Sequence, residues 1–96
     1  MEPDSNPAWP PPPGATSVQP YSAAKGYRTF MAFFAALDES DPYSPSVAVE
    51  GKQYVTGRVE RWISVYAPAG ERLSSFDAFR LARFLLDAAD ALDRYK

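Results

Sequence analysis

The sequence predicts an α+β fold, in which a three-stranded antiparallel β-meander is packed by one C-terminal α-helix. Three observations lead to this class. Seven of the ten prolines fall in residues 1–20, two β-branched runs flank a Thr-Gly pair, and helical periodicity covers residues 74–94. A chain of 96 residues allows one small domain. We expect that domain at residues 25–96, preceded by a disordered proline-rich tail at residues 1–24.

The tail predicted at residues 1–24 holds only two charged residues and is otherwise small, polar and proline-rich. Proline lacks a backbone N–H and fixes φ, so this density of proline opposes both helix and sheet. The run Trp9-Pro10-Pro11-Pro12-Pro13-Gly14 should adopt extended polyproline II structure. The composition favours a disordered leader or spacer. The alternative is a docking segment that binds an aromatic groove, with Trp9 as a candidate partner contact.

Residues 27–37 are apolar and fit two periodicities. As a strand, the segment places Phe30 and Phe34 on one face, and Thr29, Met31 and Phe33 on the other. As a helix it gathers Tyr27, Phe30, Phe34 and Leu37, and the fold becomes α-β-β-α. We favour the strand, because a third strand makes a sheet wide enough to carry a helix.

Residues 46–67 predict a β-hairpin around Thr56-Gly57. A three-residue loop at Val55-Thr56-Gly57 pairs Tyr54 with Arg58 and puts Gly57 in the left-handed position of a G1 bulge. One face then carries the pairs Gln53–Val59, Gly51–Arg61, Val49–Ile63 and Val47–Val65. The other carries Lys52–Glu60, Glu50–Trp62 and Ala48–Ser64. This register leaves Arg61 on the apolar face, from which we expect it to escape past the sheet edge.

Residues 74–94 predict the C-terminal helix. Ser74 with Asp77 three residues later resembles a capping box, with Asp in place of the usual Glu or Gln. Helical spacing then continues through Phe79, Ala82, Leu85, Leu86, Ala89 and Leu92. The pairs Arg83–Asp87 and Asp90–Arg94 have the i,i+4 spacing of helical ion pairs.

The composition excludes several classes of function. The chain contains no His and no Cys, so it lacks the residues of triad hydrolases and of zinc or iron–sulfur sites. We therefore expect neither an enzyme nor a bound cofactor or metal. Asp87, Asp90 and Asp93 recur every third residue, and we interpret them as a solvated helix face rather than as a cation site.

Charge and hydropathy limit the partners. The formal net charge is −2, and residues 25–96 carry 10 basic and 10 acidic side chains, which disfavours binding to a phosphate backbone. No apolar run approaches the roughly 20 residues that a membrane-spanning helix needs. No secretory signal pattern begins the chain. We expect a cytoplasmic protein with a protein partner, and dimerisation is one way to cover its sheet.

The outward face of the hairpin is the candidate partner-binding site. It gathers Tyr54, Trp62 and Tyr66 with Lys52 and Arg58, and aromatic side chains between charges are typical of protein interfaces. Three covers of this face stay open as alternatives: the proline-rich tail, the loop at residues 38–46, or a second copy in a homodimer. A further alternative is a regulatory nucleic-acid binder that stacks bases on this face and adds Arg61 and Arg72.

Two stretches carry a resemblance. Residues 59–66, Val-Glu-Arg-Trp-Ile-Ser-Val-Tyr, precede a helix at residues 78–93 of the form Ala-x-x-Leu-Ala-x-x-Leu-Leu-x-Ala-Ala-Asp. Together they resemble small uncharacterised proteins of actinobacteria, especially mycobacteria and their phages. The resemblance implies a strand-plus-helix architecture and a phage or prophage setting, and it implies no activity. Phe76, Phe79 and Phe84 depart from the smaller residues usual in that helix.

Overall fold

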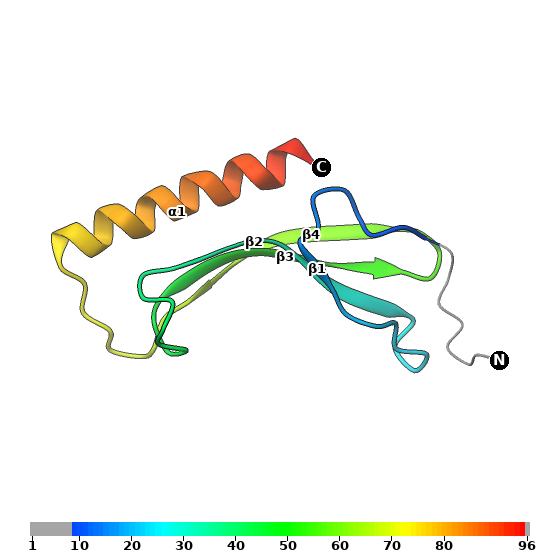
Figure 1. Cartoon of the computed structure of the whole chain (residues 1–96), viewed down its shortest axis with the longest axis horizontal. Helices are drawn as coiled ribbons and strands as arrows, with labels where there is room; N and C mark the ends of the chain where they lie inside the picture. Colours follow the sequence, from blue (N-terminus) through cyan, green and yellow to red (C-terminus); the bar gives the residue numbers. More distant parts are fainter. Residues whose placement is uncertain (1–8, 96) are drawn as a thin grey trace.

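The computed structural model describes residues 9–95, which form an antiparallel sheet with one helix across a single face (Figure 1). The elements are β1 (Ser17–Val18), β2 (Tyr27–Ala36), β3 (Ser46–Tyr54), β4 (Val59–Tyr66) and α1 (Ser75–Arg94). The strand order is β1-β2-β3-β4, so every strand pairs with its neighbour in the chain. The predicted α+β meander with a C-terminal helix is confirmed. Residues 27–36 form a strand, so the α-β-β-α alternative is wrong.

The sheet has four strands in the described region rather than the three predicted, and the fourth comes from the segment predicted as disordered tail. The Thr16 N–H donates to Met31 O at 2.7 Å, and the Gln19 N–H donates to Thr29 O at 2.9 Å. Proline lacks a backbone N–H donor but keeps its carbonyl oxygen as an acceptor. Side chains of the sheet, Gln53 and Arg61, donate hydrogen bonds to the carbonyls of Pro10 and Pro13. Composition could not show this docking, because the hydrogen-bond partners of the segment lie on other strands, such as Met31 and Thr29 on β2. Residues 1–8 of the predicted tail lie outside the described residues.

The hairpin between β3 and β4 has the predicted register, from Ser46 opposite Tyr66 to Gln53 opposite Val59. Gly57 has a φ of 93°, a backbone conformation that would be strained for a residue with a side chain. Its N–H donates to Tyr54 O at 2.8 Å. The Tyr54 N–H in turn donates to Arg58 O at 2.8 Å. The three-residue turn with its left-handed glycine is therefore confirmed, and so is the division of residues between the two faces of the hairpin.

A β-bulge in β2 changes which side chains share a face. Met31 lies opposite Glu50 and Phe33 lies opposite Val49, so two strand steps on β2 match one on β3. Phe33 consequently packs in the core beside α1, and Phe34 lies on the other face, where it is 53% exposed. The predicted grouping of Phe30 with Phe34 is wrong for this reason: simple alternation assumes a strand without an extra residue.

The core lies between α1 and the sheet. Val47, Val49 and Ala88 are fully enclosed, and side chains from β2, β4 and α1 pack around them: Ala32, Phe33, Ile63, Leu81, Phe84, Ala91 and Leu92. Farther along β3, Gly51 leaves room for the Phe30 ring, since a Cβ at Gly51 would lie 2.7 Å from Phe30 Cζ and would also collide with Glu60 O. The glycine in this central strand is thus required by close packing.

The helix is anchored at its first turn as predicted. Ser74 Oγ accepts from the Asp77 N–H at 3.1 Å, which satisfies one free donor of the helix N-terminus. Arg80 Nη2 donates to Leu37 O at 3.1 Å and ties this end of α1 to the end of β2. The predicted pairs Arg83–Asp87 and Asp90–Arg94 form at 3.3 and 2.9 Å.

Arg61 stays on the helix-covered face instead of escaping past the sheet edge. Its Nη1 donates to Tyr95 O at 2.8 Å and its Nη2 to Pro13 O at 3.0 Å. The guanidinium carbon lies 5.5 Å from the Phe30 ring centroid. Burial lowers the pKa of Arg61 from its ordinary value. The predicted escape is wrong because carbonyls from the helix end and from the proline-rich segment meet over this position.

We expect Arg61→Leu to lower the free energy of unfolding by about 2 kcal/mol, since a hydrogen bond from a charged donor contributes about 1.5–3 kcal/mol. The Pro13 and Tyr95 carbonyls would lose their donor together. Urea denaturation measures the loss. The control is Arg83→Leu, which removes an arginine from the exposed ion pair Arg83–Asp87 on the helix. An Arg61→Leu protein as stable as wild type would contradict the bridging role.

We also expect Gly51→Val to destabilise the protein by about 1–3 kcal/mol, the usual cost of overpacking. The added side chain would displace the Phe30 ring and press on the β4 backbone. The measurement is the midpoint of chemical denaturation, with Thr29→Val on the opposite face of β2 as the control. Equal midpoints for Gly51→Val and wild type would refute the close packing.

Candidate binding surface

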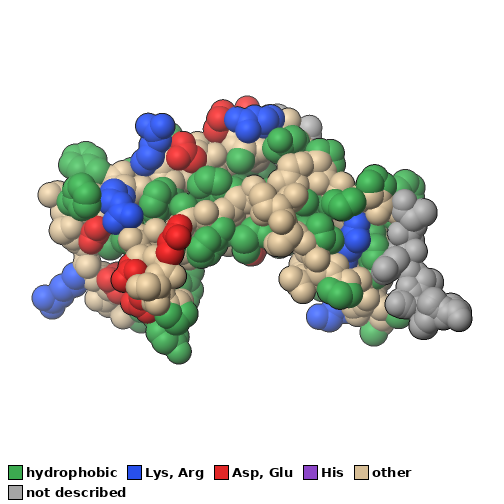
Figure 2. Space-filling view, viewed as in Figure 1, with side chains coloured by type: hydrophobic (Ala, Val, Ile, Leu, Met, Phe, Trp, Pro, Cys, Tyr) green, Lys and Arg blue, Asp and Glu red, His purple; other side chains and the backbone are tan. Residues whose placement is uncertain are grey.

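The sheet is arched, and the face away from α1 is the hollow side of the arch (Figures 1 and 2). We call this surface the concave face. The register places five cross-strand rows of three side chains each on this face, one side chain from β2, one from β3 and one from β4 or, in the first row, from Arg58 just before β4. From the hairpin turn to the far end, the rows are Tyr27–Tyr54–Arg58, Thr29–Lys52–Glu60, Met31–Glu50–Trp62, Phe34–Ala48–Ser64 and Ala36–Ser46–Tyr66.

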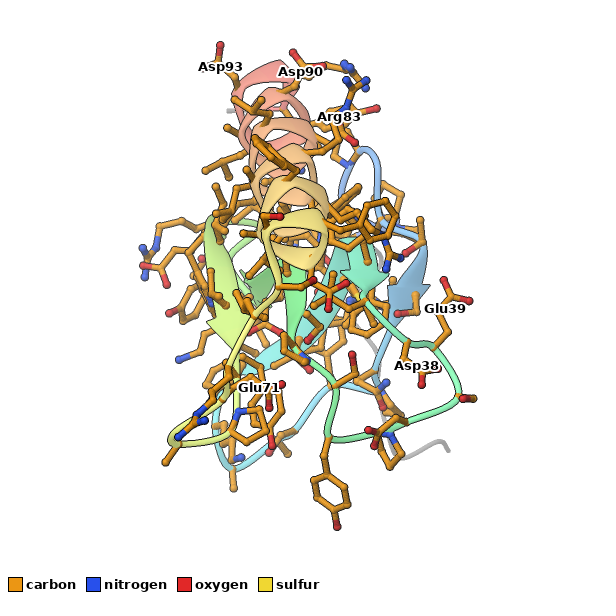
Figure 3. The ribbon with its side chains drawn as sticks, turned by 90° about the vertical axis from the view of Figure 1, so that its left-hand side faces the viewer. Asp38, Glu39, Glu71, Arg83, Asp90 and Asp93 are labelled. Atoms are coloured by element: carbon orange, nitrogen blue, oxygen red, sulfur yellow. The ribbon has the colours of Figure 1, made fainter. Side chains whose placement is uncertain are left out.

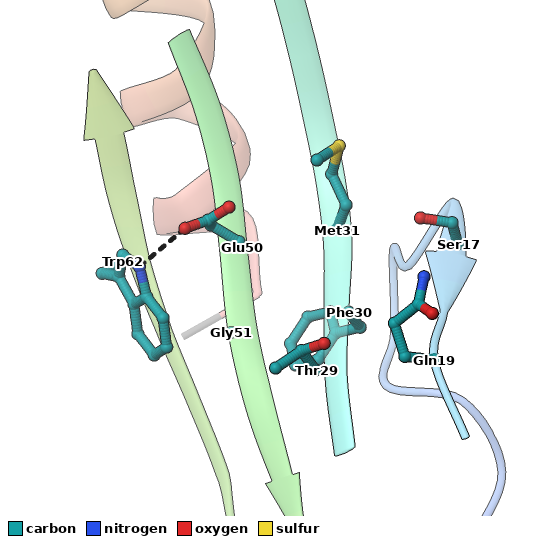
Figure 4. A pocket seen from close by; sticks show the side chains of 8 residues that line it. All are labelled: Ser17, Gln19, Thr29, Phe30, Met31, Glu50, Gly51 and Trp62. Atoms are coloured by element: carbon teal, nitrogen blue, oxygen red, sulfur yellow. Dashed lines mark hydrogen bonds between the residues drawn. The ribbon is translucent and has the colours of Figure 1, made fainter. Parts of the chain in front are cut away.

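The centre of the concave face is a hollow of about 240 Å³ beside Glu50 and Trp62 (Figure 4). Glu50 Oε1 accepts from Trp62 Nε1 at 3.3 Å and from Ser64 Oγ at 2.7 Å. These two bonds fix the carboxylate and the indole together, and Glu50 forms no ion pair with any residue between 9 and 95. The hollow is completed from β1, β2 and the segment after β1 by Ser17, Gln19, Thr29, Phe30 and Met31, with Gly51 at its floor.

The turn end of the concave face is a network of aromatic rings and charges. Arg58 lies 4.2 Å from the Tyr54 ring centroid, and its Nη1 pairs with Glu60 Oε2 at 2.8 Å. The Tyr54 hydroxyl donates to Glu60 Oε1 at 2.9 Å. These donors, the Tyr54 hydroxyl first, hold the pKa of Glu60 below its ordinary value, and Glu60 raises the pKa of Arg58. Lys52 Nζ lies 4.4 Å from the Tyr27 ring centroid.

The far end of the concave face is more apolar. Phe34 and Tyr66, 53% and 45% exposed, border a second hollow of about 250 Å³. The loop after β2 forms its rim with Glu39, Asp41 and Pro42. Within this loop Asp38 accepts from both the hydroxyl and the N–H of Ser40, which lowers the pKa of Asp38. Figure 3 shows Asp38 and Glu39 on this loop. The loop therefore borders the concave face at one end.

Five of the six predicted contact residues share this face: Lys52, Tyr54, Arg58, Trp62 and Tyr66. Trp9 lies elsewhere. Its Nε1 donates to Val55 O at 2.8 Å, and its ring lies against Gly57 at the hairpin turn. The neighbouring Pro10 carbonyl accepts from Gln53 Nε2 at 3.0 Å, and Gln53 belongs to the helix-covered face. Residues 9–14 thus contact the opposite face, and they do not cover the concave one.

Sequence reasoning about the site missed the residues that β1, the segment after it and β2 contribute to the hollows: Ser17, Gln19, Met31 and Phe34. Alternation along residues 27–37 already put Thr29 and Met31 on one face of a strand, and that was the available signal for Met31. No signal marked Ser17 and Gln19, because their place depends on the pairing of β1 with β2.

Comparison with protein-family models, with curated proteins and with solved structures finds no match for the chain. The resemblance to small actinobacterial and phage proteins therefore stays a prediction. In residues 9–95 no helix has the length and apolar character needed to cross a membrane.

We expect the pKa of Glu60, measured by NMR titration of its carboxyl carbon, to lie below the ordinary Glu value and to rise in Tyr54→Phe. The folded state holds the charged carboxylate, so this contribution to stability is present above the ordinary pKa. It is lost as the pH falls through the lowered one. Tyr66→Phe, at the far end of the face, is the control. A Glu60 pKa that is unchanged in Tyr54→Phe would contradict the network.

Proposed function

We propose that this protein is a non-catalytic interaction module whose concave face binds a segment of a protein partner. The observation that carries the proposal is the central row of this face. Trp62 and Glu50 are held in place by mutual hydrogen bonding beside an open hollow. Side chains fixed before binding lose little conformational entropy when a partner arrives, and tryptophan is among the residues that contribute most to interfaces.

The charges of the face favour a protein over a nucleic acid. Arg58 is already paired with Glu60, and Lys52 lies over the Tyr27 ring. The carboxylate of Glu50 occupies the centre, where it would repel a phosphate backbone. Arg61, which the nucleic-acid alternative needs, lies on the opposite face with both terminal nitrogens bonded. A mixed face of this kind suits a peptide segment that carries polar and basic side chains.

The non-catalytic part of the proposal rests on the residue types. The concave face presents carboxylates, amines, phenols and an indole, and the whole chain contains no His and no Cys. The resemblance noted in the sequence adds a phage or prophage setting, and we place the protein in the cytoplasm.

The test is capture of partners from the source organism with the tagged full chain, followed by titration of the purified partner. We expect Trp62→Ala to weaken the complex by at least about tenfold, since truncation of an interface hot spot costs about 2 kcal/mol or more. Tyr66→Ala should weaken it by a smaller factor because Tyr66 lies at the edge of the face. The matched control is Arg83→Ala, which changes a side chain 75% exposed on the helix.

Circular dichroism and thermal unfolding establish that each variant is folded. Capture is repeated after nuclease treatment, and loss of the partner at that step would favour the nucleic-acid alternative instead. Equal affinities for wild type, Trp62→Ala and Tyr66→Ala would remove the concave face as the binding site.

A further inference from the structure

The side of the molecule formed by β4 and α1 exposes many large apolar side chains. Seven exposed large hydrophobic residues of the described region lie on β4, α1 or the connection between them. Tyr66 belongs to the concave face, and Phe76 lies beside Arg80 on the β2 side of the helix. The remaining five are Val65, Leu73, Phe79, Leu85 and Leu86. Phe79 is 77% exposed and Leu86 is 68% exposed. Isolated apolar residues on a surface are ordinary, but a contiguous group marks an interaction site.

The outer edge of β4 is unpaired in the described structure. The Tyr54 N–H donates to Arg58 O, and antiparallel pairing then alternates along the hairpin. Backbone groups of the even-numbered β4 residues therefore bond to β3, whereas those of Val59, Arg61, Ile63 and Val65 point outward. No described residue pairs with this edge, since β4 ends the sheet order. A free strand edge is a template for another strand.

The apolar flank of the helix lies above this same edge. Arg80 reaches Leu37 O at the end of β2, so its side of α1 faces β2. A helix turns about 100° per residue, which places Leu85 about 140° around the axis from Arg80, on the β4 side. Leu85 is 39% exposed and Val65 is 55% exposed. The helix charges lie elsewhere: Arg83, Asp90 and Asp93 project from the side of α1 away from the sheet (Figure 3).

We propose that a second copy of this chain docks on this surface, with the two β4 strands paired antiparallel across a two-fold axis. The free edge and the apolar helix flank are then both covered by one contact. The unpaired edge favours a second copy as the partner, because a two-fold axis brings two identical free edges together. Each outward N–H of one β4 strand then has a carbonyl of the other as its acceptor.

The residues along β4 select the register of this pairing. An axis at Arg61 would set two guanidinium groups opposite each other, which is unfavourable. An axis at Trp62 opposes no like charges and uses the whole strand. Its cross-strand pairs are Trp62 with its own copy at the axis, Val59 with Val65, Arg61 with Ile63, Glu60 with Ser64, and Arg58 with Tyr66. The outward-pointing residues then face each other in the hydrogen-bonded positions, as an antiparallel ladder requires.

The size of the core supports the same occupant. Six hydrophobic residues are buried in residues 9–95, three of them alanines, and Val47, Val49 and Ala88 form the enclosed centre. Domains with so little buried apolar surface gain most from association. The net charge of −2 per copy opposes that association only weakly.

Sedimentation equilibrium of the full chain tests the proposal from micromolar to near-millimolar concentration. We expect wild type to sediment at twice the chain mass of 10.6 kDa at the upper end of this range. Val65→Lys and Leu85→Asp should each weaken the dimer at least tenfold. Both residues are exposed, so the monomer should remain folded, as circular dichroism will show. The control is Phe34→Lys, a similarly exposed residue on the concave face.

Amide hydrogen exchange provides the second measurement. The N–H groups of Val59, Arg61, Ile63 and Val65 should be protected in wild type at high concentration and should exchange rapidly in Val65→Lys. A wild-type monomer throughout the concentration range would overturn the proposal. So would a dimer in which these amides stay unprotected, or one that Phe34→Lys alone disrupts. The proposed pairing brings the Trp62 side chains of the two copies side by side on the concave face. Val65→Lys and Leu85→Asp replace side chains on the helix-covered side only, so failure of this test does not remove the concave face as the partner-binding site.

Discussion

Arg61 is the side chain on which the arrangement of this molecule depends. It rises from an edge strand into the helix-covered face and donates to two carbonyls from distant parts of the chain, Tyr95 O and Pro13 O. Its Nε is buried without a partner, so the charge is held by the two terminal nitrogens and by the ring of Phe30. A cation placed under an apolar cover is costly unless such acceptors are supplied. The helix end and the proline-rich segment supply them.

The two segments that Arg61 bridges lie on the same face of the sheet. The helix packs on the convex face over Val47 and Val49, and residues 9–14 contact the same face at Gln53 and Arg61. Gly14 lies against the Tyr95 ring, where the two segments meet. With both covers on the same face, the concave face carries none from residues 9–14 or α1. The aromatic and charged rows on it are therefore not covered by these two segments, while Trp9 and Pro12 contribute to the structure of the domain itself.

The bulge in β2 determines which aromatic side chain lies in the core and which lies on the concave face. By shifting the alternation between Met31 and Phe33, it turns Phe33 toward the core and Phe34 toward the concave face. A regular strand would have exchanged the two rings, so the core would have been built around Phe34. The open side of the sheet and the free β4 edge then offer two surfaces that adjoin along β4. The first suits a mixed polar and aromatic contact, and the second suits strand pairing beside an apolar helix flank.

The sequence by itself determined the features that depend on residues close together along the chain. The Val55–Gly57 turn, the face assignment of the β3–β4 hairpin and the Ser74 cap each follow from residues a few positions apart, and five of the six candidate contact residues followed from that register. The tertiary structure alone decided the docking of residues 9–18, the place of Arg61 and the bulge in β2. These depend on contacts such as Arg61 with Pro13, which are 48 residues apart. Composition and periodicity describe what a segment can do alone, whereas donors and cavities on another element decide where it finally lies.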